Sequence, residues 1–213
     1  MKVNYLMFGG HPDDFVFCGG GTGLKFIDAG GRAKYISATN GDIGSPNMSG
    51  GEYARYRLDS VNKVVEQFHV QHEIWSDHDG EFEYSLAYRF KVLEEIREFE
   101  SDIVVCPRIW DLHPDRSTIG KLVSEASYFA TIPNILALVP ALKKSPVVLY
   151  MYDKVTKPLS FQCDVAVSID DKIDDIIAMA DKHDSMVYEW DAFMMGTLDE
   201  VSRMTHEEKV RMA

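Results

Sequence analysis

Residue types suited to metal binding and proton transfer gather in one short stretch, residues 9–23, with the sequence GGHPDDFVFCGGGTG. His11 and Asp14 lie three residues apart, and Pro12 between them stiffens the turn. An imidazole and a carboxylate are suitable zinc ligands, so this pair could supply part of a metal site. Asp13 would point elsewhere and could act as general base toward a water molecule whose pKa the metal lowers to about 7.

A later turn offers a second proton carrier. Residues 108–116 have the sequence RIWDLHPDR, and His113 within them could act as a general acid. A metal site, a base and an acid together are the equipment for metal-assisted hydrolysis of an amide. The alternative is that HPDD is only a tight, capped exit from a strand, and the spacing alone leaves both interpretations open.

The glycines that follow the HPDD turn raise the question of a nucleotide site. Gly19, Gly21 and Gly23 come too late after the preceding apolar run, and the G-x-G-x-x-G spacing fails at Leu24. A dinucleotide-binding domain is therefore the poorer interpretation. We expect these glycines to let the loop approach a neighbouring strand closely.

Strands and helices must position these turns. The apolar run at residues 3–8 predicts a strand covered on both faces, which ends just before the HPDD turn. Further strands are predicted at residues 33–38, 73–76, 102–107, 147–152 and 164–169. Helices are predicted at residues 22–29, 52–68, 86–99, 117–131 and from 170 to about 189, with Ser117 as an N-cap.

This alternation predicts an α/β fold that is Rossmann-like, with a mostly parallel sheet and helices on both faces. Polar turns around His11, Asn40 and His113 each follow a predicted strand. They could converge on one crevice, because parallel strands open their binding sites at their carboxyl ends. We expect one domain at residues 1–195 and a C-terminal tail at residues 196–213, either a short helix or a frayed end.

Composition excludes several classes of function. The formal net charge of −12 over 213 residues argues against a broad nucleic-acid surface. No apolar run approaches membrane-spanning length and no signal segment is recognisable, so we expect a cytoplasmic protein without membrane insertion. The three cysteines are widely scattered and fit neither a disulfide framework nor a CxxC metal pattern.

These turns, in this order, resemble the PIG-L/LmbE family of zinc-dependent N-deacetylases. The resemblance covers about residues 3–190 and rests on five segments: HPDD at 11–14, TNGD at 39–42, HDGE at 78–81, HPD at 113–115 and YEW at 188–190. Family members act on N-acetylglucosaminyl compounds. The resemblance implies an LmbE-like fold and a metal-dependent hydrolase that removes an acetyl group from an N-acetylated amino sugar or a related small amide.

The resemblance also implies roles for the residues of the two turns. His11 and Asp14 match the first two zinc ligands of the family. Asp13 matches the catalytic base. His113 matches the histidine that protonates the leaving amine or stabilises the oxyanion.

Substrate contacts are implied for residues further along the chain. Arg57 looks like the family's helix arginine near the substrate, and Asp42 closes the TNGD loop and is expected on the substrate side. The substrate would be a small amino-sugar-like molecule, held partly by variable loops at residues 43–51 and 133–145. Apolar residues in the second loop suit either a pocket rim or a subunit contact in a homo-oligomer, and both alternatives stand.

Arg116 is the main departure from the family pattern. The second motif of the family is HPDH, and its last histidine, the third zinc ligand, aligns with Arg116. A protonated guanidinium cannot coordinate a metal. Either Arg116 pairs with Asp14 and zinc binds weakly or not at all, or Arg116 turns away and His113 or a water completes a weakened site. The alternative function is thus a degenerate member in which Arg116 and Arg57 bind a sugar-like or anionic ligand without catalysis.

Overall fold

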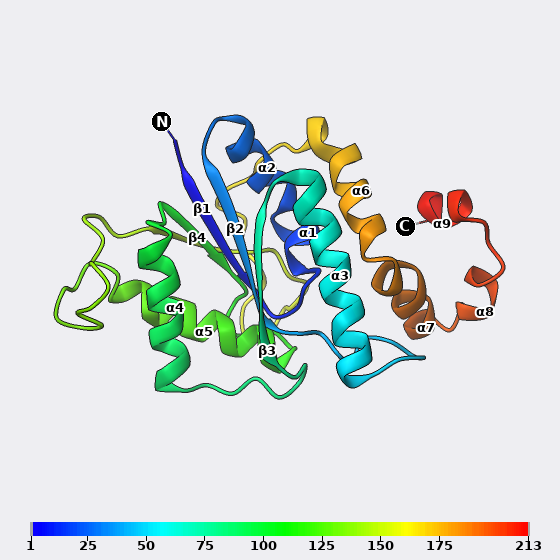
Figure 1. Ribbon diagram of the computed structural model, residues 1–213, viewed down its shortest axis with the longest axis horizontal. Helices are drawn as coiled ribbons and strands as arrows, with labels where there is room; N and C mark the ends of the chain where they lie inside the picture. Colours follow the sequence, from blue (N-terminus) through cyan, green and yellow to red (C-terminus); the bar gives the residue numbers. More distant parts are fainter. Residues whose placement is uncertain (1, 213) are drawn as a thin grey trace.

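A five-stranded parallel sheet forms the centre of the computed structural model, which describes residues 2–212 (Figure 1). The strands are β1 Asn4–Gly9, β2 Arg32–Thr39, β3 Gln71–Asp77, β4 Ile103–Cys106 and β5 Val147–Tyr150. Their order across the sheet is β3-β2-β1-β4-β5, and each neighbouring pair is parallel. The chain order reverses between β1 and β4, and the carboxyl ends of strands at such a switch point are the usual place for a ligand site in this architecture.

Helices cover both faces of the sheet, as the sequence predicts. Along β1, Leu6 and Phe8 join one core with α4 Leu86–Glu98 and α5 Pro114–Tyr128. Tyr5 and Met7 alternate onto the other face, because successive side chains of a strand point in opposite directions. The helices of that second face are α1 Asp14–Cys18, α2 Gly20–Asp28, α3 Gly50–Phe68 and α6 Ile173–Lys182 (Figure 1). Both cores fix β1 from its two sides and so fix the turn that follows it.

The start of α5 differs from the prediction in a way that matters for the site. The helix begins at Pro114, and its N-cap is His113 rather than Ser117. The His113 Nδ1 accepts a hydrogen bond from the Asp115 backbone N–H at 3.3 Å, and proline at the first helical position has no N–H to satisfy. The earlier start places Asp115 and Arg116 in the first turn of the helix, after the loop at residues 107–113 that follows β4.

The C-terminal part of the chain is less regular than predicted. The strand predicted at residues 164–169 is wrong: this segment runs without strand pairing, and Val165 and Val167 are exposed. The helix predicted from residue 170 is broken into a 3-10 turn at Asp170–Lys172, α6, and a π-helix at Ser185–Trp190.

Short helices complete the chain as far as the structure describes it. They are α7 Asp191–Met195, α8 Leu198–Val201 and α9 His206–Met212. Val201 is buried against Val187 and Tyr188, so α8 packs on the π-helix. The last residue of the predicted tail lies outside the described residues. Within those residues, no helix combines the length and the apolar character needed to cross a bilayer.

Candidate metal and catalytic site

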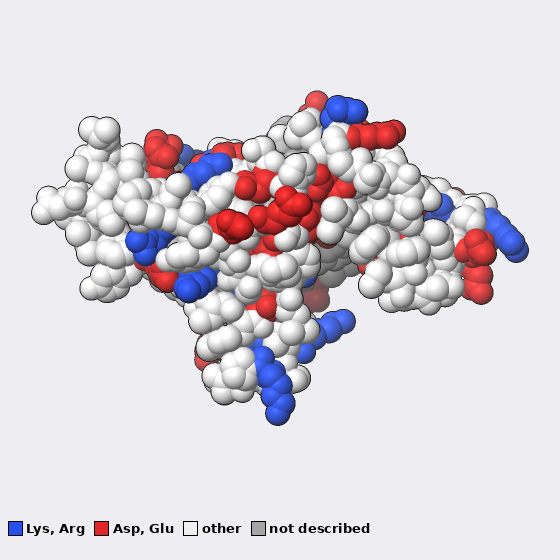
Figure 2. Space-filling view, turned by 90° about the horizontal axis from the view of Figure 1, so that it is seen from below, with Lys and Arg blue, Asp and Glu red and all other residues white. Residues whose placement is uncertain are grey.

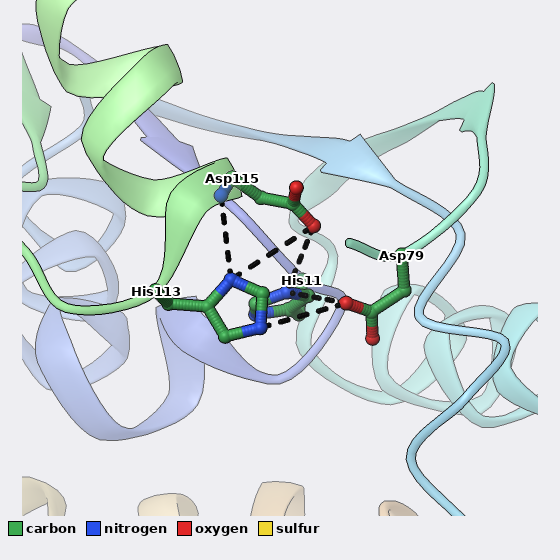
Figure 3. A group of neighbouring side chains, drawn as sticks. All are labelled: His11, Asp79, His113 and Asp115. Carbon is green, nitrogen blue, oxygen red and sulfur yellow. Dashed lines mark hydrogen bonds and ion pairs between the residues drawn. The ribbon is translucent and has the colours of Figure 1, made fainter. Parts of the chain in front are cut away.

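Four side chains of the types that bind metal ions converge at the carboxyl ends of β1, β3 and β4 (Figure 3). His11 follows β1, Asp79 follows β3, and His113 and Asp115 begin α5 after β4. The His11 Nε2 lies 3.1 Å from Asp79 Oδ1 and 3.4 Å from Asp115 Oδ2. One potential ligand atom from each of the four residues falls within 4.8 Å of the others. Acidic side chains gather near the middle of the molecular face viewed from below Figure 1 (Figure 2).

The HPDD turn is folded tightly against the end of β1. Asp14 Oδ2 accepts hydrogen bonds from the backbone N–H groups of Gly10 at 2.7 Å and His11 at 3.1 Å, which holds the turn closed. A Cβ on Gly10 would lie 2.9 Å from the Arg116 Cγ, so glycine here lets α5 approach β1. The turn therefore presents the His11 ring to the loops that follow β3 and β4.

Asp14 is engaged by Arg116 rather than open to a metal. The Arg116 Nη2 donates to Asp14 Oδ1 at 2.5 Å, and the Arg116 Nε donates to the same oxygen at 3.0 Å. Burial opposes the charge on Asp14, but Arg116 and His11 hold the pKa of this carboxyl well below its usual range. This is the first of the two arrangements considered for Arg116, in which the guanidinium pairs with Asp14.

Asp13 points into the protein and pairs with Arg57 of α3. The Arg57 side chain is only 1% exposed, and a Cβ added to Gly41, whose φ is +66°, would lie 3.2 Å from the Arg57 Nε. Burial opposes the charge on Asp13, yet Arg57 keeps the pKa of Asp13 below its ordinary value. Arg57 thus lies behind Asp13, and its contact with a substrate stays a prediction.

Asp42 is also buried, and it organises the loop after β3. Its Oδ2 lies 2.6 Å from the His78 Nδ1, and its Oδ1 accepts a hydrogen bond from the Asp79 N–H at 3.1 Å. The hydrogen bond to Asp42 raises the pKa of His78. Asp42, predicted to bind substrate, therefore supports the position of Asp79.

Sequence reasoning assigned no role to Asp79 and Asp115. Asp115 is fully buried and accepts hydrogen bonds from the backbone N–H groups of Gly80 at 2.8 Å and Phe82 at 3.3 Å. These bonds tie the loop after β3 to the start of α5 and bring Asp79 to His11. One feature of the sequence does indicate a role at the site: both aspartates lie inside turns, HDGE and HPD, that follow predicted strands.

The two histidines of the site differ in their charge. Burial opposes a charge on His11, but hydrogen bonds to Asp115, Asp14 and Asp79 raise its pKa well above the ordinary value. Burial, together with neighbouring His11, lowers the pKa of His113. The ring centroids lie 4.3 Å apart. At neutral pH the surroundings of His11 therefore favour a positive charge on its ring, whereas the His113 imidazole is neutral.

The chemistry of these donors fits a divalent metal ion. Imidazole nitrogen and carboxylate oxygen are the ligand types that zinc takes in hydrolases. The His11 ring faces two carboxylates, an arrangement that requires a cation between them or on the ring. His11, Asp79 and Asp115 offer these ligand types with His113 beside them, whereas Asp14 has Arg116 against it.

Comparison with known proteins gives relatives that are similar to this chain in sequence or in fold. The chain is 34% identical over 130 residues to diacetylchitobiose deacetylase of Thermococcus kodakarensis, covering 58% of this chain and 49% of that protein. It therefore spans about half the length of this relative. The structure matches N,N'-diacetylchitobiose deacetylase from Pyrococcus horikoshii with a TM-score of 0.74 and 25% identity, over 85% of this chain and 70% of that one.

A third similarity concerns the fold alone. The structure of 4-carboxy-2-hydroxymuconate hydratase from Pseudomonas putida matches with a TM-score of 0.76 and 16% identity, over 94% of this chain and 86% of that one. The same scaffold thus supports different chemistry in different proteins. The family model for GlcNAc-PI de-N-acetylase matches residues 6–127, which is more than half of the chain and includes HPDD, HDGE and HPD. This protein belongs to the GlcNAc-PI de-N-acetylase (PIG-L) family.

Proposed function

We propose that this protein is a zinc-dependent N-deacetylase that removes the acetyl group from an N-acetylated amino sugar or a related small amide. The observation that carries the proposal is the convergence of His11, Asp79, His113 and Asp115 at the carboxyl ends of three strands. Family membership and the two similar deacetylases of diacetylchitobiose support the substrate class.

A metal held by His11 and the neighbouring carboxylates would polarise the amide carbonyl of the substrate. Asp13 then serves as the general base that takes a proton from the attacking water. Arg57 holds Asp13 in one orientation and in the ionised form that a base requires. The short sequence separation of His11 and Asp13 puts both functions on one rigid turn.

His113 is suited to donate a hydrogen bond. Its Nδ1 accepts from the Asp115 N–H, so the proton of the neutral ring lies on Nε2. This Nε2–H faces the cluster, 3.6 Å from Asp79 Oδ1. Because the pKa of His113 is lowered, its ring is neutral at pH 7. A hydrogen bond from His113 to the oxyanion therefore suits this residue better than the role of an acid that is already protonated and gives its proton to the leaving amine.

The alternative of a non-catalytic binder for anionic ligands has less support. It needs Arg57 and Arg116 as free cations in the crevice. Arg57 is paired with Asp13 and buried, and Arg116 is paired with Asp14. Neither arginine offers an unshared charge to a ligand in this arrangement.

Acetate release tests the proposed function. The zinc-supplemented protein should release acetate from N,N'-diacetylchitobiose or another N-acetylated amino sugar, and Asp13→Asn should lower the rate about 100-fold or more. Glu81→Gln is the matched control, because it removes an exposed carboxylate in the loop after β3, and it should retain the rate of acetate release. Absence of acetate from a panel of N-acetylated sugars, with zinc bound, would refute the proposal.

A further inference from the structure

The structure points to a metal site that is shifted away from the HPDD carboxylate: we propose that His11 Nε2, Asp79 and Asp115 bind the divalent ion, while Asp14 only supports the His11 ring. The role of this metal in deacetylation rests on the proposed function. Metal binding itself can be measured independently of deacetylase activity.

Asp14 has no open coordination site in the observed arrangement. Its Oδ2 accepts two backbone N–H groups, and its Oδ1 receives the Nη2 and Nε of Arg116. A metal at this carboxylate would have to displace a guanidinium that carries a full positive charge. Two cations at one buried carboxylate repel each other, and the Arg116 charge cannot be removed by deprotonation.

The other side of the His11 ring has the geometry that a metal requires. Zinc bonds to nitrogen and oxygen of about 2.0–2.2 Å in a tetrahedral site place the ligand atoms about 3.3–3.5 Å apart. The His11 Nε2 lies 3.1 Å from Asp79 Oδ1 and 3.4 Å from Asp115 Oδ2. The separation from Asp115 lies within this range and the separation from Asp79 is slightly shorter, and all three side chains are at least nine-tenths buried.

Asp14 takes the supporting position behind His11. Its Oδ2 lies 3.8 Å from the His11 Nδ1, on the ring edge opposite the two carboxylates. Histidines that bind metals through one nitrogen commonly turn the other toward a carboxylate, which orients the ring. Asp14 and Arg116 then form a neutral pair next to the site, and the charge of the ion is balanced by Asp79 and Asp115.

His113 lies beside this site as its most exposed member. Its side chain is 33% exposed, against 9% or less for the other three members of the cluster. Its Nδ1 is occupied by the Asp115 N–H, and its Nε2 lies 3.6 Å from Asp79 Oδ1. Three protein ligands are the number that catalytic zinc sites use, and the His113 Nε2–H would donate a hydrogen bond to a substrate bound at the ion.

Zinc binding by the whole protein tests this assignment. The affinity for ZnCl2 is measured by competition with a chromophoric chelator, and Co²⁺ absorption reports on the ligands. We expect Asp79→Asn and Asp115→Asn, which remove ligands, each to weaken zinc binding by more than about 100-fold. The double variant Asp14→Asn/Arg116→Met, which removes only the support of His11, should weaken it less, by about 10-fold. Glu81→Gln is the control for loss of a carboxylate in the same loop.

The opposite pattern would overturn the proposal. If the double variant loses zinc while Asp79→Asn retains it, the metal lies at Asp14. If the unmodified protein binds no zinc, no metal site exists at this cluster. Circular dichroism identifies a variant that fails to fold. Asp115→Asn could fail in this way, because Asp115 also accepts backbone hydrogen bonds, and the zinc affinity of Asp79→Asn then tests the assignment. Zinc binding without acetate release would sustain this site and refute only the proposed function.

Discussion

The buried pair of Asp13 and Arg57 should stabilise the fold as well as the orientation of the base. The side chains are 9% and 1% exposed. Removing one partner of such a pair leaves the other as an uncompensated buried charge, at a cost of about 3–5 kcal/mol. Arg57→Met should therefore lower the free energy of unfolding by that amount. For a domain of this size, the melting temperature should fall by about 6–20 °C.

A double-mutant cycle separates the pair from other effects of the substitutions. Asp13→Asn/Arg57→Met removes both charges, so it should recover about 2–3 kcal/mol relative to the sum of the single variants. Urea unfolding followed by circular dichroism supplies the free energies. Arg55→Met, at an exposed position on the same helix, is the control and should change stability by no more than about 0.5 kcal/mol. An Arg57→Met variant as stable as Arg55→Met, or single effects that simply add, would refute the reasoning.

Two further predictions concern stability. His183 is fully buried, and within residues 2–212 its ring nitrogens have no hydrogen-bond partner; burial lowers its pKa to about 4. The unfolded chain therefore binds the extra proton between pH 6.5 and 4, and stability falls as the pH falls, by about 2 kcal/mol between pH 7 and 5 for this group. His183→Gln should flatten that part of the stability–pH curve in urea titrations, and an unchanged slope would show that His183 does not cause it. Gly120→Ala should destabilise the protein by about 1–3 kcal/mol, because a Cβ at Gly120 would meet the Pro107 carbonyl oxygen at 2.3 Å. Ser117→Ala on the same helix is the control and should have a mild effect. A melting temperature of Gly120→Ala equal to that of the control would contradict this packing argument.

The sequence predicts the parts of the fold that depend on local pattern. The apolar run at β1 and the polar turn after it are both evident in the sequence, because a strand buried on both faces must be continuously apolar. The false strand at residues 164–169 has the same local appearance. Val165 and Val167 alternate with other residues, but the segment follows β5, the last strand at its edge of the sheet, and both side chains are exposed. Whether an alternating segment joins a sheet depends on a neighbour that the local pattern does not specify.

The candidate site depends on contacts between distant parts of the chain. His11 and Asp14 stand out because their types and spacing suit a metal, yet their environments differ once the chain is folded. Asp79 reaches His11 only because the loop after β3 is tied to Asp115 by backbone hydrogen bonds. The pairing of Arg116 with Asp14 was one of two arrangements open at the sequence level, since spacing cannot tell which way a long side chain turns.

The most direct test of a metal-dependent deacetylase is acetate release measured on the same preparation before and after metal removal. The protein stripped with a chelator should release no acetate from N,N'-diacetylchitobiose or from the other N-acetylated sugars of the panel. Addition of one equivalent of ZnCl2 should restore release from at least one of them, and Asp13→Asn with zinc bound should remain about 100-fold slower or more. Equal release by the stripped and zinc-loaded protein, or no release from any of these sugars with zinc bound, would contradict the account.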